Sequence, residues 1–444
     1  MPFRETRETL KLAIPITLGS VSQVLIGVVD SVMIGAVGAA PLAASAFTNG
    51  VFMLFLIVGM GLLLPVSVLV ARARPGDGGA AAWLRHGLLL GAGVCVAGTL
   101  GLLALIPFFP LFGQPAEVLG ELQPFYVLVS LSLAPALLHH VLRQYAEARG
   151  EPWLPMLLSL AGVPLNAALN WVLIFGKLGF PELGLAGAGI ATLLSRCAVL
   201  AALALLLKRR HRTEPGMPRG AKAWLARPEA GRVREFLRLG LPSAGQLLCE
   251  VSAFSGAAVM MGWLGTTALA AHQVALSTCT LTFMFPLGLA SAASIRISSA
   301  LPEGDRAHLR RIGLNAVFLA LCAMTASAAT FLLAGRQISA LYIDDPEVIA
   351  LSARLLVIAG LFQLFDGTQV VCAGALRGLS DVKVPTLVTG VAYWVLAMPT
   401  SYLAGVLWLG PEGIWAGLAA GLCFAALTLG WRLLSHTAPG SPAA

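Results

Sequence analysis

Long apolar segments dominate the chain and leave few folds open to it. Each runs for about 20 residues or more and is separated from the next by a polar loop. A bilayer core of about 30 Å is crossed by roughly 20 apolar residues in a helix. The pattern predicts twelve transmembrane helices, at residues 12–36, 44–71, 86–107, 122–146, 154–175, 184–207, 237–262, 268–298, 312–334, 347–374, 385–408 and 412–434.

The composition excludes a soluble globular protein. Apolar residues make up 58% of the 444 residues and charged residues 11%, whereas soluble domains carry about 25% charged residues. The net charge of +8 is also found in proteins that bind nucleic acid, so that class of partner has to be considered. The basic residues lie between the apolar segments and form no aromatic and basic face, so we expect no nucleic-acid partner.

Neither the cysteines nor the N-terminus changes this interpretation. The seven cysteines lie within apolar segments, without a CxxC pair or a cluster with histidine, so we expect no zinc or iron–sulfur site and no cofactor. The charged N-terminus leads into an apolar segment that is too long for the core of a signal peptide. We interpret that segment as the first span.

The basic residues also predict the orientation in the membrane. They gather in the loops on the N-terminal side, above all between Lys208 and Arg238, whereas the opposite loops hold only Lys177 and Arg336. Because cytoplasmic loops carry an excess of Lys and Arg, we expect a multi-pass inner (plasma) membrane protein with both termini in the cytoplasm. The basic segment is either a solvated connector or a contact for anionic headgroups.

The two halves of the sequence resemble each other. Residues 14–44 align with residues 241–271 at a constant offset of 227, which places Pro15 on Pro242 and Gly35 on Gly262. Parallel repeats of this kind build many transporters. We therefore predict an all-α integral membrane protein with twelve transmembrane helices in two pseudo-symmetric six-helix bundles. The predicted parts are a bundle at 1–207, a cytoplasmic basic connector at 208–236 and a bundle at 237–444.

Three acidic residues lie well inside predicted spans: Asp30, Glu250 and Asp366. A charge at that depth costs about 2.5–3.5 kcal/mol on insertion scales, and such residues usually mark an ion or substrate pathway. We interpret them as groups that bind a proton or a sodium ion, with Na⁺ a candidate at Glu250 and Asp366. The alternative is a structural hydrogen-bonding role.

Asparagines and aromatic residues supply further candidates. Asn166 and Asn170 lie one turn apart on a helix face and would reach Asp30 if the first and fifth spans meet; packing between helices is the alternative. The run Phe283, Met284 and Phe285 is a candidate drug pocket or part of the core. We expect His139, His140 and His272 to be satisfied polar residues, with a role as proton carriers as the alternative. The sequence leaves the roles and partners of Arg196 and Arg354 open.

Several motifs are similar to those of the multidrug and toxic compound extrusion family over essentially the whole chain. They are VVDSVMIG in the first span, the AAHQ, FMFP and SIR elements of the eighth, and DGTQVVCAGALRG leaving the tenth. The resemblance is to the NorM-type branch. It implies a cation site at Glu250 and Asp366 and a second protonatable cluster of Asp30, Asn166 and Asn170.

One departure from that branch concerns the coupling ion. Some NorM-type members carry a tyrosine one turn before the tenth-span acid, where this chain has Phe362. The missing oxygen ligand favours coupling to H⁺ over Na⁺, although both stay open.

The resemblance implies an antiporter that acts as a monomer and exports amphipathic, often cationic, organic compounds and drugs through the bilayer by alternating access. A flippase for a lipid-linked precursor from the same superfamily is the alternative. A passive channel would not need two alternating halves. HExxH and GxSxG motifs do not occur, so we do not expect an enzyme.

Overall fold

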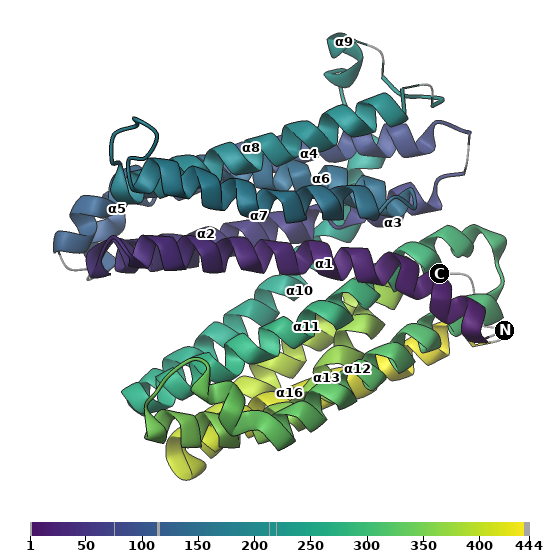
Figure 1. The fold of residues 1–444 in the computed structure, drawn as a ribbon. Coiled ribbons are helices and arrows are strands. Elements are labelled where there is room, and N and C mark those ends of the chain that lie inside the picture. The colour runs from purple at the N-terminus through teal and green to yellow at the C-terminus, as the bar shows by residue number, and fades with distance from the viewer. Residues whose placement is uncertain (1, 75, 113–115, 213, 219, 439–444) are drawn as a thin grey trace. The chain divides into compact units, whose positions relative to one another are not determined.

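The computed structural model describes residues 2–74, 76–112, 116–212, 214–218 and 220–438, and its only regular elements are helices (Figure 1). They are α1 (Pro2–Gly35), α2 (Ala39–Leu63), α3 (Pro65–Arg72), α4 (Gly79–Leu103), η1 (Ile106–Phe112), α5 (Ala116–Leu131), α6 (Leu133–Ala148), α7 (Trp153–Ile174), α8 (Gly184–Arg210), α9 (Ala221–Trp224), α10 (Ala230–Trp263), α11 (Thr266–Ala300), η2 (Leu301–Glu303), α12 (Arg306–Ala340), α13 (Pro346–Gly378), α14 (Lys383–Gly390), η3 (Val391–Ala397), α15 (Met398–Ser401), η4 (Tyr402–Leu409) and α16 (Pro411–His436).

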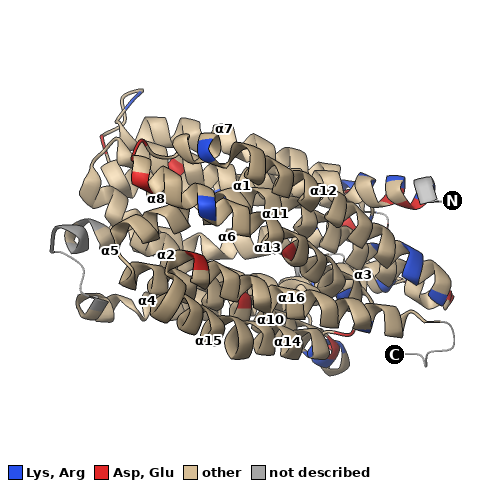
Figure 2. Cartoon of the chain, turned by 90° about the horizontal axis from the view of Figure 1, so that it is seen from below, with Lys and Arg blue, Asp and Glu red and all other residues tan. Residues whose placement is uncertain are grey.

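Within the described residues, twelve helical segments are long and apolar enough to cross a membrane, which confirms the predicted count. Most of their length carries no charge (Figure 2). The second crossing joins α2 and α3, and the eleventh runs from Lys383 to Leu409. The eleventh contains two π-helical stretches, η3 and η4, on either side of a turn that holds Pro399, whose nitrogen has no hydrogen to donate.

Contacts between residues divide the chain into two compact units. One unit is Leu18–Ala244; the other is Met1–Thr17 together with Gly245–Ala444. Both boundaries fall inside helices, α1 and α10, so each of these helices begins in one unit and ends in the other. Thr17 and Ala244 are 227 positions apart, the offset of the sequence repeat. The predicted parts at 1–207, 208–236 and 237–444 describe the repeats and stay a prediction.

The start of α1 packs against α11 through small residues. A Cβ atom on Gly288 would overlap Thr17 Oγ1 and would lie 2.9 Å from the carbonyl oxygen of Ala13. Ala13 is buried in a cluster with Leu289. Close approach through glycine and alanine is a common way for membrane helices to pack, because apolar burial gives no driving force between helices in lipid. We call this contact the α1–α11 crossing.

The start of α10 packs against α2 in the same way, which we call the α10–α2 crossing. A Cβ atom on Gly61 would lie 2.5 Å from Ala244 Cα. The backbone oxygen of Leu62 lies against Gly240. Gly61 and Gly288 are also 227 positions apart, so the two crossings occupy equivalent places in the two repeats.

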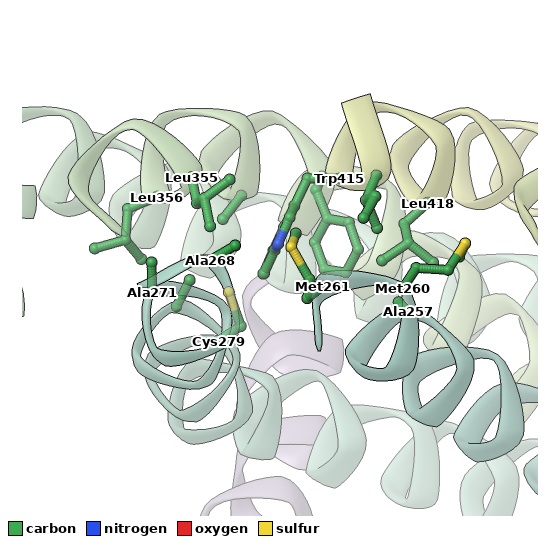
Figure 3. Packing of buried hydrophobic residues seen from close by; sticks show 14 of the residues in the cluster. Ala257, Met260, Met261, Ala268, Ala271, Cys279, Leu355, Leu356, Trp415 and Leu418 are labelled. Atoms are coloured by element: carbon green, nitrogen blue, oxygen red, sulfur yellow. The ribbon is translucent and has the colours of Figure 1, made fainter. Parts of the chain in front are cut away.

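In the unit that holds Gly245–Ala444, α13 is the central helix and contacts α11, α12 and α16. Glycines let it approach its neighbours closely: a Cβ on Gly374 would lie 2.5 Å from the backbone oxygen of Ala290 on α11. The largest fully buried side chain is Trp415 of α16, which packs among residues such as Leu356 and Met261 (Figure 3).

In the unit Leu18–Ala244, α8 contacts α5, α6 and α7, and α4 contacts α6. The connector after α8 is attached by Glu214, whose carboxylate accepts hydrogen bonds from Tyr145 Oη at 3.1 Å, His211 Nδ1 at 2.8 Å and Arg149 Nη2. Burial raises the pKa of Glu214, but the hydrogen bonds from His211 and Arg149 outweigh it and hold the pKa below its usual range. The carboxylate is therefore charged at neutral pH.

Candidate functional site

The acids Glu250 of α10 and Asp366 of α13 lie close enough to each other for their charges to interact. Asp366 is 7% exposed and Glu250 is half-buried. No described group hydrogen-bonds Asp366 Oδ1, although that oxygen is buried. A buried oxygen without a partner usually indicates a water, an ion or a proton at that place. The structure thus brings together the two acids that the sequence singled out in this half.

Neutral polar side chains accompany this acid pair. Tyr393 Oη donates to Gln369 Oε1 at 3.1 Å, and Gln363 Nε2 donates to Thr282 Oγ1. The other amide atoms, Gln363 Oε1 and Gln369 Nε2, are buried without a hydrogen-bond partner among the described residues. Both glutamines lie on α13, within one turn of Asp366. The site therefore has unused donors and acceptors for a bound proton, cation or water.

Aromatic rings pack around Phe362 beside this polar set. The Phe362 ring lies 6.0 Å from Phe254 and 5.6 Å from Trp415, and Phe254 lies 6.0 Å from Tyr393. Position 362 is buried and offers no oxygen. Tyr393, from the π-helical η3, instead brings a buried hydroxyl close enough for Glu250 and Asp366 to act on it electrostatically. Sequence reasoning missed this residue.

A basic residue also belongs to this region. The charges of Arg377, near the end of α13, and Glu250 interact. Arg377 is only partly exposed. The acid pair is therefore accompanied by one positive charge, which compensates part of its negative charge.

In the unit Leu18–Ala244, Asp30 of α1 meets the asparagines of α7. Asn170 Nδ2 donates to Asp30 Oδ1 at 2.6 Å and to Asn166 Oδ1 at 3.2 Å. Thr192 Oγ1 of α8 donates to Asp30 Oδ2 at 3.3 Å. The predicted contact between Asp30 and Asn170 is therefore present, and Asn166 also lies close enough to Asp30 to interact with it. Both asparagines are fully buried, and Asn166 Nδ2 and Asn170 Oδ1 have no hydrogen-bond partner among the described residues.

Arg196 of α8 completes this second cluster. Its guanidinium donates to Ser132 Oγ at 2.6 Å, lies 4.9 Å from the centre of the Phe52 ring and interacts electrostatically with Asp30. The sequence could not name these partners. A cation over an aromatic face is stabilised by about 0.5–2 kcal/mol, so the positive charge is held in place near the acid.

The predicted aromatic run lies on α11. Phe283, Met284 and Phe285 are each half-buried, and Phe285 packs against the cluster that holds Ala13. The backbone oxygen of Met284 accepts a hydrogen bond from Thr17 Oγ1 at 3.4 Å. Part of this run therefore packs in the core, and the drug pocket stays a prediction.

His140, His272 and Arg354 have ordinary polar partners, whereas one ring nitrogen of His139 does not. His140 Nε2 lies 3.1 Å from Gln144 Nε2, while His139 Nε2 is buried without a hydrogen-bond partner among the described residues. Trp415 Nε1 donates to His272 Nδ1 at 3.2 Å. Arg354 forms a largely exposed ion pair with Glu412 at 2.8 Å.

One further acid, which is buried like Asp366, was missed because it lies just beyond the predicted fourth span. Glu147 of α6 is 3% exposed, and its Oε1 accepts from Arg143 Nε at 2.6 Å. Arg143 Nη2 also donates to Ser20 of α1 at 3.0 Å. Both charges are matched, so this pair holds α1 against α6.

Among the described residues, no group of three or more His, Cys, Asp or Glu side chains could hold a metal ion. A sodium ion at the acid pair would therefore need amide, hydroxyl or water oxygens in addition to the two carboxylates. Oxygen atoms of Gln363 and Tyr393 are the available kinds of ligand. A proton needs only one carboxylate oxygen.

Comparisons with known proteins give one consistent result. The MatE family model matches twice, at residues 15–172 and 242–403. A probable multidrug resistance protein NorM from Bradyrhizobium diazoefficiens is 35% identical, and the alignment covers 98% of this chain and 94% of that protein. The multidrug resistance protein NorM of Photobacterium profundum is 33% identical, and the alignment covers 97% of this chain and 95% of that protein. An outward-facing multidrug resistance MATE transporter has the same fold, with a TM-score of 0.86 and 22% identity over 97% and 96% of the two chains.

Proposed function

Because the chain belongs to the MatE family of multidrug and toxic compound extrusion transporters, of the NorM type, we propose that it is an antiporter. It exports amphipathic organic cations in exchange for protons. Its family is one of transporters rather than of enzymes. The single observation that carries the proposal is the interacting pair of Glu250 and Asp366, with an oxygen of Asp366 buried and unpartnered. We place the protein in the inner membrane as a monomer, with both termini in the cytoplasm.

The exchange follows from competition for the acid pair. A charged carboxylate attracts a cationic drug, and a proton on the same carboxylate removes that attraction. A ligand shifts a conformational equilibrium only through its different affinities for the two states. Protonation from outside therefore favours drug release, and loss of the proton inside restores the affinity for the next drug.

We propose the proton over sodium because position 362 is phenylalanine and offers no oxygen. Two neighbouring oxygens already accept hydrogen bonds: Gln369 Oε1 accepts one from Tyr393, and Thr282 Oγ1 accepts one from Gln363. A proton has no such requirement for several ligands, whereas a sodium ion is held by several oxygens.

The Asp30 cluster would work as a second protonatable site. A charged Asp30 accepts the Asn170 N–H at 2.6 Å. A protonated Asp30 has an O–H to donate instead, and the unpartnered Asn170 Oδ1 becomes its acceptor once the amide rotates. Uptake of a proton thus reorganises the contact between α1 and α7.

The test is ethidium efflux from proteoliposomes under imposed proton and sodium gradients, each applied alone. We expect the proton gradient to drive efflux and expect Glu250→Gln and Asp366→Asn to abolish it. Glu303→Gln removes an acid whose side chain is 67% exposed and should transport normally, so it is the matched control. Wild-type rates in both site variants would refute the proposal. Efflux that is driven by the sodium gradient and not by the proton gradient would show that the coupling ion is Na⁺ and not H⁺.

A further inference from the structure

The first turns of α10 carry a groove that the transport site does not use. It is lined by Pro228, Val233, Arg234, Leu237, Arg238 and Leu241, together with Ala230, and has a volume of about 630 Å³. From Ala230 onward these positions recur at intervals of three and four residues, which places them on one face of the helix. The groove therefore follows the helix axis for about three turns.

The opposite face of α10 is fixed by packing within its own unit. Phe236 and Leu239 are buried, and the guanidinium of Arg232 lies 5.2 Å from the centre of the Trp83 ring. The segment before the helix is also tied down, because the Glu229 amide donates to His86 Nε2 at 3.0 Å. The helix cannot rotate to bury the groove face without losing these contacts.

Two arginines of the groove have no ion-pair or hydrogen-bond partner in the described part of the chain. Arg234 and Arg238 are both exposed, whereas Arg232 pairs with Glu229 at 2.8 Å. The acid between them in sequence, Glu235, interacts electrostatically with Arg72. The groove thus presents two uncompensated positive charges four residues apart.

Apolar side chains lie next to these charges, where the helix enters its apolar stretch. Leu237 is 37% exposed and Leu241 is 59% exposed. Arg238 is the last basic residue of α10 before the long apolar stretch that ends at Trp263. Charge at the membrane surface with apolar surface one turn deeper matches a molecule that has an anionic head and a hydrocarbon body.

We propose that this groove binds an anionic phospholipid, with Arg234 and Arg238 on the phosphate and Val233, Leu237 and Leu241 against the upper part of the acyl chains. The guanidinium group suits phosphate because it donates two parallel hydrogen bonds. The bound lipid covers the exposed start of α10, the helix that passes from one compact unit to the other. The site is separate from the acid pair and does not depend on the coupling ion.

The proposal is tested by native mass spectrometry of the purified protein titrated with phosphatidylglycerol or phosphatidylethanolamine. We expect wild type to bind phosphatidylglycerol more tightly. Arg234→Gln with Arg238→Gln should weaken this binding about 25-fold, since each basic residue near an anionic surface contributes about fivefold.

The matched control is Lys208→Gln with Arg209→Gln, which removes the same charge from exposed residues at the end of α8 and should bind as wild type. Leu241→Ser should weaken phosphatidylglycerol binding but should not affect glycerol 3-phosphate, which lacks acyl chains. Equal losses in the two double variants would overturn the proposal, as would equal binding of the two lipids by wild type. If the first double variant is unstable, Arg238→Gln compared with Arg209→Gln decides the same question.

Discussion

The two crossings can be tested by adding a single methyl group to each. In Gly288→Ala, the new Cβ overlaps Thr17 Oγ1 and lies 2.9 Å from the oxygen of Ala13. Overpacking of this kind costs about 1–3 kcal/mol. In Gly61→Ala, the new Cβ lies 2.5 Å from Ala244 Cα, and a similar cost is expected.

The two sites differ in what can relieve the overlap. At the α1–α11 crossing the nearest atom belongs to a side chain, so Thr17→Ala removes it. That change alone costs less than about 1 kcal/mol, because the hydroxyl makes only a long hydrogen bond of 3.4 Å to the backbone oxygen of Met284. At the α10–α2 crossing the nearest atom is backbone, and Ala244→Gly does not remove it.

We therefore expect Thr17→Ala to restore about half or more of the stability lost in Gly288→Ala, a coupling of roughly 1 kcal/mol. Ala244→Gly should not rescue Gly61→Ala. Gly262→Ala is the control for helix propensity, since its new Cβ would meet no atom within 4 Å, and it should be neutral or stabilising. Melting of the detergent-solubilised protein is measured for the five single variants and for the two double variants, Gly288→Ala with Thr17→Ala and Gly61→Ala with Ala244→Gly. A Gly288→Ala protein as stable as wild type would disprove the packing argument.

Three other substitutions have defined outcomes. Asn170→Leu removes the amide that donates to Asp30, a charge-assisted bond worth about 1.5–3 kcal/mol, and should slow proton-driven ethidium efflux at least tenfold. Because the pKa of Glu214 is lowered in the folded protein, its stabilising effect is complete above the usual carboxyl pKa and is lost as the pH falls through the lowered value. Hydrogen exchange of the connector, corrected for intrinsic rates, should therefore rise on acidification in wild type but not in Glu214→Gln. Arg354→Gln breaks an exposed ion pair and should change stability by less than about 1 kcal/mol.

The fold could be predicted largely from hydropathy, because the membrane forces nearly every apolar segment into a helix. The ends of the helices could not be predicted. The first span was expected from residue 12, yet α1 begins at Pro2, since polar helical turns continue beyond the apolar stretch. The π-helical stretches of the eleventh span also have no signal in hydropathy.

Within the candidate sites, the sequence identified charged residues better than neutral ones. Asp30, Glu250 and Asp366 were conspicuous because charge is rare inside a span. Tyr393, Gln363 and Gln369 were missed because a neutral polar residue becomes informative only when its neighbours are known. Arg143 and Glu147 are four residues apart, and that spacing could have indicated their ion pair.

The path of α1 and α10 also bears on how such a chain could arise. The opening turns of the first helix of each repeat belong to the opposite compact unit, and both helices pass into their own unit at matching positions, after Thr17 and after Ala244. Two identical copies of a single ancestral repeat, related by a two-fold axis, would make both exchanges with one set of residues, as swapped homodimers do. Fusion of the copies then preserves a reciprocal dependence, so neither half expressed alone should reach its mature packing without the other.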